Sequence, residues 1–137
     1  MRTILALGLM LFGLAGCGNE VTTVSDLPAT VWLRVGDEVR LTSPALGLRL
    51  EAIVQDSRCP VDVTCVQAGS VTVRLAVMRP GQPDSEILLD SDRTDSSTGL
   101  VLRIDQVKPA PRAGVVIAPG EYRVSLEIAP QIAPTGI

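Results

Sequence analysis

Residues 122–128 read YRVSLEI, and apolar and polar side chains alternate through this stretch without a break. The even-numbered positions carry Tyr, Val, Leu and Ile, whereas the odd-numbered positions carry Arg, Ser and Glu. Successive side chains of a β-strand point to opposite faces of its sheet. The pattern therefore predicts a half-buried strand whose even-numbered side chains belong to a hydrophobic core.

The same period of two recurs along the chain, in segments that are separated by turn residues. These segments are 31–35, 39–41, 48–54, 71–77 and 100–105, and a shorter run lies at 86–90. Gly36-Asp37 between the first two segments predicts a hairpin, and Pro80-Gly81 predicts a turn after 71–77. Residues 91–99 are expected to form a polar surface loop.

Seven or eight short strands, each with one apolar face, predict an all-β fold. A single antiparallel β-sandwich of the immunoglobulin-like kind fits best, because an open sheet would leave its apolar face in water. A small barrel is the alternative. The core must be built from Val, Leu and Ile, since Phe12, Trp32 and Tyr122 are the only aromatic residues.

The amino terminus has the features of an export signal. A basic Arg2 precedes the apolar run 4–15, which is shorter than the about 20 residues that a membrane-spanning helix needs. The tetrad Leu14-Ala15-Gly16-Cys17 resembles the bacterial lipobox, whose cysteine receives lipid before the peptide is cut off. The alternative is an ordinary signal peptide that leaves Cys17 as a free thiol. We expect acylated Cys17 to insert into membrane lipid.

These features divide the chain into four parts: a signal peptide (1–16), a lipidated tether (17–29), the β-sandwich domain (30–129) and a flexible tail (130–137). The predicted location is the bacterial cell envelope. Gly18 rather than Asp after the cysteine resembles routing to the outer membrane, on its periplasmic or external face, in hosts that have one.

The charge balance argues against some partners. Signal cleavage removes only Arg2 among charged side chains, so 12 basic side chains become 11 against 15 acidic ones, a net charge of −4. This sign argues against nucleic acid and against attraction to anionic lipid. The arginines from Arg34 to Arg123 are expected to form a mixed, solvated face, with anion or glycan recognition as the alternative.

The remaining two cysteines predict a disulfide. With Cys17 acylated, Cys59 and Cys65 form an even pair in an oxidising compartment. Five residues separate them, whereas catalytic dithiols generally have a two-residue spacing. A metal site at these thiols would need further ligands, and the chain has no histidine. We expect neither a metal nor a cofactor.

The composition also bears on catalysis. Without histidine, His-based triads, Cys-His pairs and zinc-protease motifs are excluded. A Ser-Lys dyad could use only Lys108, which lies beside Pro109. Outward carboxylates such as Glu127 are expected to pair with arginines on neighbouring strands. The sequence therefore predicts a non-enzymatic protein, and a carboxylate-dependent envelope hydrolase is the remaining enzymatic alternative.

The most unusual residues lie between two predicted strands, in Asp56-Ser57-Arg58-Cys59-Pro60 and Cys65-Val66-Gln67-Ala68-Gly69. They resemble a family of uncharacterised bacterial envelope lipoproteins with an Asp-Ser-Arg-Cys-Pro segment, a second cysteine and Val-Trp-Ala-Gly after it. The resemblance extends to the lipobox and the closing strand. It implies relatives rather than an activity, and Gln67 replaces the family's tryptophan.

We interpret this segment as a strand crossover that is closed by a Cys59–Cys65 bridge. Pro60 and Gly69 would shape its turns, while Asp56 and Arg58 would cap its amides and carbonyls. The protein would then be an interaction or structural module. In the alternative, an inhibitor or ligand-binding lipoprotein presents this loop to an unknown envelope partner. The candidate binding residues are Asp56, Arg58, Pro60, Val61, Asp62, Val63, Thr64 and Gln67.

Overall fold

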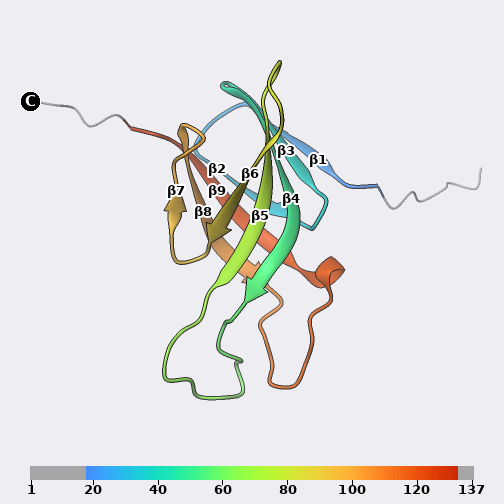
Figure 1. Cartoon of the computed structure of the whole chain (residues 1–137), viewed down its shortest axis with the longest axis vertical. Coiled ribbons are helices and arrows are strands. Elements are labelled where there is room, and N and C mark those ends of the chain that lie inside the picture. The colour runs from blue at the N-terminus through green and yellow to red at the C-terminus, as the bar shows by residue number, and fades with distance from the viewer. Residues whose placement is uncertain (1–17, 133–137) are drawn as a thin grey trace, which may run out of the picture.

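The computed structural model describes residues 18–132, so the predicted signal peptide, Cys17 and residues 133–137 lie outside the described residues. Two β-sheets pack face to face (Figure 1). One sheet has the strand order β1-β3-β4-β5-β6 and the other has the order β2-β9-β8-β7. The strands are β1 (Val21–Val24), β2 (Ala29–Leu33), β3 (Glu38–Thr42), β4 (Ala45–Asp56), β5 (Val71–Met78), β6 (Ser85–Asp90), β7 (Thr94–Asp95), β8 (Leu100–Lys108) and β9 (Arg123–Pro130). The sheets do not close into a barrel, which confirms the predicted all-β sandwich.

Aliphatic side chains from both sheets form the core, as the composition predicts. Leu48 and Leu50 of β4 are fully buried, and so are Leu102 of β8 and Ile128 of β9 in the opposite sheet. Burying a leucine or isoleucine side chain stabilises a fold by about 1.5–3 kcal/mol. The period-two segments therefore supply most of the hydrophobic stabilisation.

The YRVSLEI stretch forms the central part of the second sheet. Strand β9 pairs with both β2 and β8, and its Val124, Leu126 and Ile128 are buried as expected. On the outer face, Glu127 forms an ion pair with Arg103 of β8, which confirms that charges pair across strands here.

The predicted first hairpin is wrong, because β2 and β3 belong to different sheets. Gly36, with φ +99°, donates its amide to the carbonyl of Leu50 at 2.6 Å. The carboxylate of Asp37 accepts the amide of Arg34 at 2.8 Å. These contacts hold a crossing between the sheets, so that the apolar faces of both strands cover one core from opposite sides.

The predicted end of the tether at residue 29 is wrong, because the chain joins the domain earlier. Val21–Val24 forms β1, which pairs parallel to β3 in an otherwise antiparallel sheet. Just before it, the amide of Glu20 donates to Asp37 at 2.9 Å, and the carbonyl of Glu20 accepts the amide of Glu38 at 2.9 Å. The chain is thus fixed to the sheet from Glu20 onward.

The alternation predicted for 48–54 holds only at its start. Register shifts with β5 follow Leu50 and Ile53. After the first shift Ile53 packs on the core, and Val54 is 46% exposed. Such bulges bend a strand and turn its side chains to new faces. Strand β4 continues to Asp56, which it places at the end of the sandwich.

Outside the main strands, the described chain has little regular structure. The predicted polar loop 91–99 contains the short strand β7, and Pro119–Glu121 forms a turn of 3-10 helix, η1. Between Gly18 and Ile132, no helix is long and apolar enough to span a membrane.

Candidate functional site

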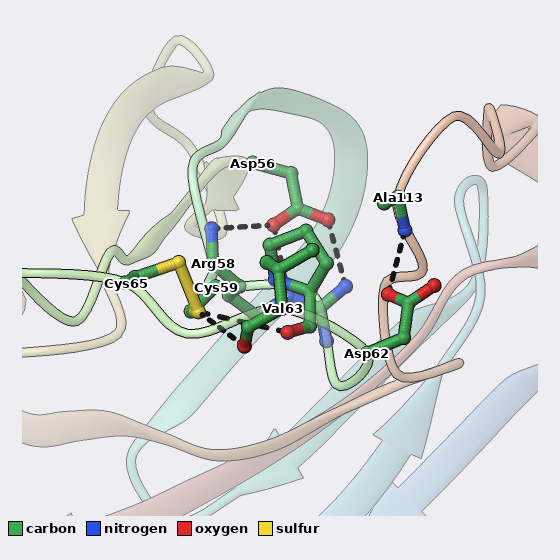
Figure 2. Close-up of a disulfide and its surroundings, with 8 residues drawn as sticks. Asp56, Arg58, Cys59, Asp62, Val63, Cys65 and Ala113 are labelled. Carbon is green, nitrogen blue, oxygen red and sulfur yellow. Dashed lines mark hydrogen bonds and ion pairs between the residues drawn. A yellow bond between two sulfur atoms is a disulfide. The ribbon is translucent and has the colours of Figure 1, made fainter.

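Two loops project together from one end of the sandwich, at the bottom of the view in Figure 1. We name residues 57–70, between β4 and β5, the cysteine loop, and residues 109–118, between β8 and η1, the proline loop. The amide of Val61 donates to the carbonyl of Pro111 at 2.9 Å. The amide of Ala113 donates to Asp62 Oδ1 at 2.9 Å (Figure 2). These bonds make the two loops one surface.

The predicted disulfide is present in the cysteine loop (Figure 2). Cys59 and Cys65 are bonded, and their Cα atoms lie 5.9 Å apart, within the usual range for a bridge. Closing so short a loop stabilises the fold by about 2 kcal/mol through lost entropy of the unfolded chain. The bridge therefore restricts the conformations that the segment from Cys59 to Cys65 can adopt.

A bidentate ion pair holds the start of the cysteine loop. Arg58 Nε donates to Asp56 Oδ1 at 2.8 Å, and a terminal guanidinium nitrogen donates to Oδ2 at 2.7 Å (Figure 2). The backbone amide of Arg58 also donates to Oδ1, at 3.2 Å. Because the Asp56 and Arg58 side chains are only 11% and 18% exposed, water competes weakly for these bonds.

Two further bonds connect this pair to the other sheet. The hydroxyl of Tyr122 donates to Asp56 Oδ2 at 2.9 Å, and Arg58 donates to the carbonyl of Val107 at 2.9 Å. The pair therefore caps a backbone amide of the cysteine loop, as predicted, whereas the carbonyl that it caps belongs to Val107 of β8 and not to the loop. The alternation predicts Tyr122 as a core residue and gives no sign of this hydroxyl bond, although a buried tyrosine hydroxyl usually finds a partner.

These contacts shift the pKa values of the groups. The hydrogen bonds from Arg58 hold the pKa of Asp56 below its ordinary value, and burial raises the pKa of Tyr122. At neutral pH the carboxylate is therefore ionised while the phenol keeps its proton. The charged carboxylate and the neutral phenol can therefore keep their hydrogen bonds and support the cysteine loop.

The two ends of the cysteine loop meet at Ser57 and Ser70. The Ser57 amide donates to the Ser70 carbonyl at 2.8 Å, and the Ser70 amide donates to Ser57 Oγ at 3.0 Å. Next to them, a Cβ atom on Gly69 would lie 1.5 Å from the carbonyl oxygen of Ser57. Close backbone approach, rather than a positive φ, therefore requires glycine at position 69.

The joined loops expose apolar side chains. In the cysteine loop, Val61 is 60%, Val63 45% and Val66 fully exposed, and in the proline loop Val115 is 61% and Val116 90% exposed. We call these five residues the valine surface. Two of them, Val61 and Val63, are among the candidate binding residues predicted from the sequence.

The structure thus separates the predicted binding residues into two groups. Asp56, Arg58 and Pro60 are partly buried and support the loop. The exposed group is Val61, Asp62, Val63, Thr64 and Gln67. Asp62 belongs to both groups, because its side chain is exposed and its carboxylate also accepts the amide of Ala113 in the proline loop.

Among residues 18–132, no three Cys, Asp or Glu side chains are grouped so that they could hold a metal ion. The candidate site is a supported loop end with apolar side chains on its outside. Comparisons with protein-family models, with curated protein sequences and with solved structures found no match.

Proposed function

We propose that this chain is a lipid-anchored β-sandwich of the bacterial cell envelope that binds another envelope protein through its valine surface. The observation that carries the proposal is the exposure of five valines on two loops that are bonded to each other. The predicted acylation of Cys17 supplies the anchor. The proposed role is binding rather than catalysis.

The exposure of these valines supports a binding role, because the fold gains no stability from placing apolar side chains in water. Single apolar residues on a surface are common and need no explanation, but groups of them mark interaction sites. Here five exposed valines lie on two loops that are joined by hydrogen bonds. Val66 and Val116 are almost entirely in water, so they contribute little to the core. A partner that covered them would gain the hydrophobic stabilisation that the free protein lacks.

The rigidity of the loops supports the same role. A disulfide, a bidentate ion pair and bonds between the loops fix the valine surface before any partner arrives. A surface that is already ordered loses less conformational entropy on association. The disulfide also fits an envelope location, since such bonds persist in oxidising compartments.

Photocrosslinking in intact bacteria tests this proposal. A photoreactive amino acid at exposed Thr64 should give a discrete crosslinked protein band, whereas one at exposed Asp84, in the β5–β6 turn, should not. Changing all five valines to serine should reduce the Thr64 band at least about tenfold, since a hot spot of 1.4 kcal/mol or more is removed.

The matched control changes exposed apolar residues elsewhere, Val21, Val54 and Leu88, to serine. Both variants should remain folded, because exposed side chains usually contribute less than about 0.5 kcal/mol each. Equal crosslinking from Thr64 and Asp84, or a Thr64 band that survives the valine changes, would reject the valine surface as the binding site.

A further inference from the structure

Three cations and the chain's one tryptophan gather on the four-stranded sheet. Arg34 follows β2, Lys108 ends β8 and Arg123 begins β9, where it is the register partner of Lys108. Trp32 of β2 is 45% exposed, and Lys108 Nζ lies 5.0 Å from the centroid of its ring. We call these four residues the basic patch.

The cations of the basic patch line an open hollow of about 780 Å³, together with Pro109, Ala110, Gly120 and Glu121. In the described part of the chain, none of the three cations forms an ion pair. The carboxylate of Glu121 accepts the amide of Ala118 at 3.1 Å instead. Three cations thus line this hollow with a single acid, Glu121.

The basic patch lies next to the point where the anchor would enter. Trp32, Arg34 and Arg123 line a smaller depression with Glu20, Thr22, Leu33 and Asp37. Glu20 is fixed by its bonds to Asp37 and Glu38, and two residues separate it from Cys17. Three residue steps span at most about 11 Å. Acyl chains on Cys17 would therefore enter the bilayer close to the basic patch.

We infer that the basic patch lies on the membrane and binds the headgroups of anionic lipids. This inference rests on the acylation that the proposed function includes. Tryptophan and basic side chains are enriched at the boundary between a bilayer and water. The net charge of −4 does not decide this contact, because fields are screened within about 8–10 Å. Of the acids beside the patch, Asp37 and Glu121 accept backbone amides, and Glu20 is the third.

Fluorescence of the acylated full-length protein in vesicles tests the orientation. Trp32 is the one tryptophan of the sequence, so its emission reports on the basic patch alone. In vesicles that contain phosphatidylglycerol, quenching of Trp32 by brominated lipid should be at least about twice that in phosphatidylcholine vesicles. About 1 M salt should remove the difference, since screening then acts within about 3 Å.

A charge-neutral variant, with Arg34, Lys108 and Arg123 changed to glutamine, should also lose the difference. In the control variant, Arg40, Arg74 and Arg93 are changed to glutamine; these residues are exposed and lie outside the patch. The control should keep the difference in quenching between the two kinds of vesicle. Equal quenching in both kinds of vesicle, or equal loss in both variants, would overturn the inference.

Flotation of the same samples tests the anchor separately, because acyl chains insert without anionic lipid. Failure to float with either kind of vesicle would reject the acylation and with it the proposed anchor. Flotation with Trp32 accessible to water in phosphatidylglycerol vesicles would reject only the orientation of the domain.

Discussion

Changing Gly69 to alanine should destabilise the protein by about 3 kcal/mol or more, which is the upper range for inserting a methyl group into a packed site. The new Cβ would lie 1.5 Å from the Ser57 carbonyl oxygen and 2.2 Å from its carbon. Both atoms are backbone, so no side-chain rotation can make room. The ends of the cysteine loop must move apart, and the Ser57–Ser70 bonds are lost. Unfolding in urea measures the change.

The matched control for this prediction is Gly120→Ala. A Cβ at Gly120 meets no atom within 4 Å, and the residue has no positive φ. This control should change the free energy of unfolding by less than about 0.5 kcal/mol. If the two alanine variants were equally stable, the close approach of Gly69 to Ser57 would be disproved.

Changing Asp56 to asparagine should cost about 2–3 kcal/mol of stability at pH 7, the scale of hydrogen bonds to a charged group. The substitution leaves the guanidinium of Arg58 without its anionic partner in a site where that side chain is 18% exposed. It also weakens the acceptor of the Tyr122 hydroxyl. Asp84→Asn, at an exposed turn, is the control and should be nearly neutral.

The pH dependence follows from the lowered pKa of Asp56. The pKa of an aspartate in the unfolded chain is about 3.9, whereas Asp56 in the folded protein keeps its charge to lower pH. Its contribution is therefore complete above about pH 5 and is lost as pH falls through the folded pKa. The stability gap between wild type and Asp56→Asn should narrow in acid. A gap that stayed constant from pH 7 to about pH 2 would contradict the ion pair's role.

The strands could be predicted from the sequence because burial on one face imposes a period of two. Residues 123–128 and 71–77 form strands as their patterns indicate, although Ser125 on the polar side of the first is also buried. The period of two does not indicate which sheet a strand joins, and for this reason the sequence predicts one hairpin from β2 and β3. Strand β1 could not be predicted, because its four residues are too few to show a period. Its parallel pairing with β3 also gives no hairpin turn that the sequence could show.

The cysteine loop could be predicted in part. Parity of the cysteines gave the disulfide, and the spacing of Asp56 and Arg58 gave their capping role. Contacts between distant positions could not be read from the pattern. Tyr122 lies 66 positions after its partner Asp56, and Ala113 lies 51 positions after Asp62. The basic patch likewise exists only because β2, β8 and β9 are neighbours.

The proline loop connects the two proposed surfaces. It begins beside Lys108 of the basic patch and carries Val115 and Val116 of the valine surface. If the basic patch rests on lipid headgroups, the valine surface is held near the bilayer. We therefore expect its partner to be a membrane-bound protein of the envelope rather than one that diffuses freely.

The central claim is that this sandwich is exported, acylated at Cys17 and oxidised at its other two cysteines. The intact mass of the protein, extracted from bacterial membranes with a thiol-alkylating reagent present, tests all three parts at once. We expect residues 17–137 with added acyl chains and no alkyl group on Cys59 or Cys65. A chain of 137 residues that carries three alkyl groups and no lipid would contradict the account.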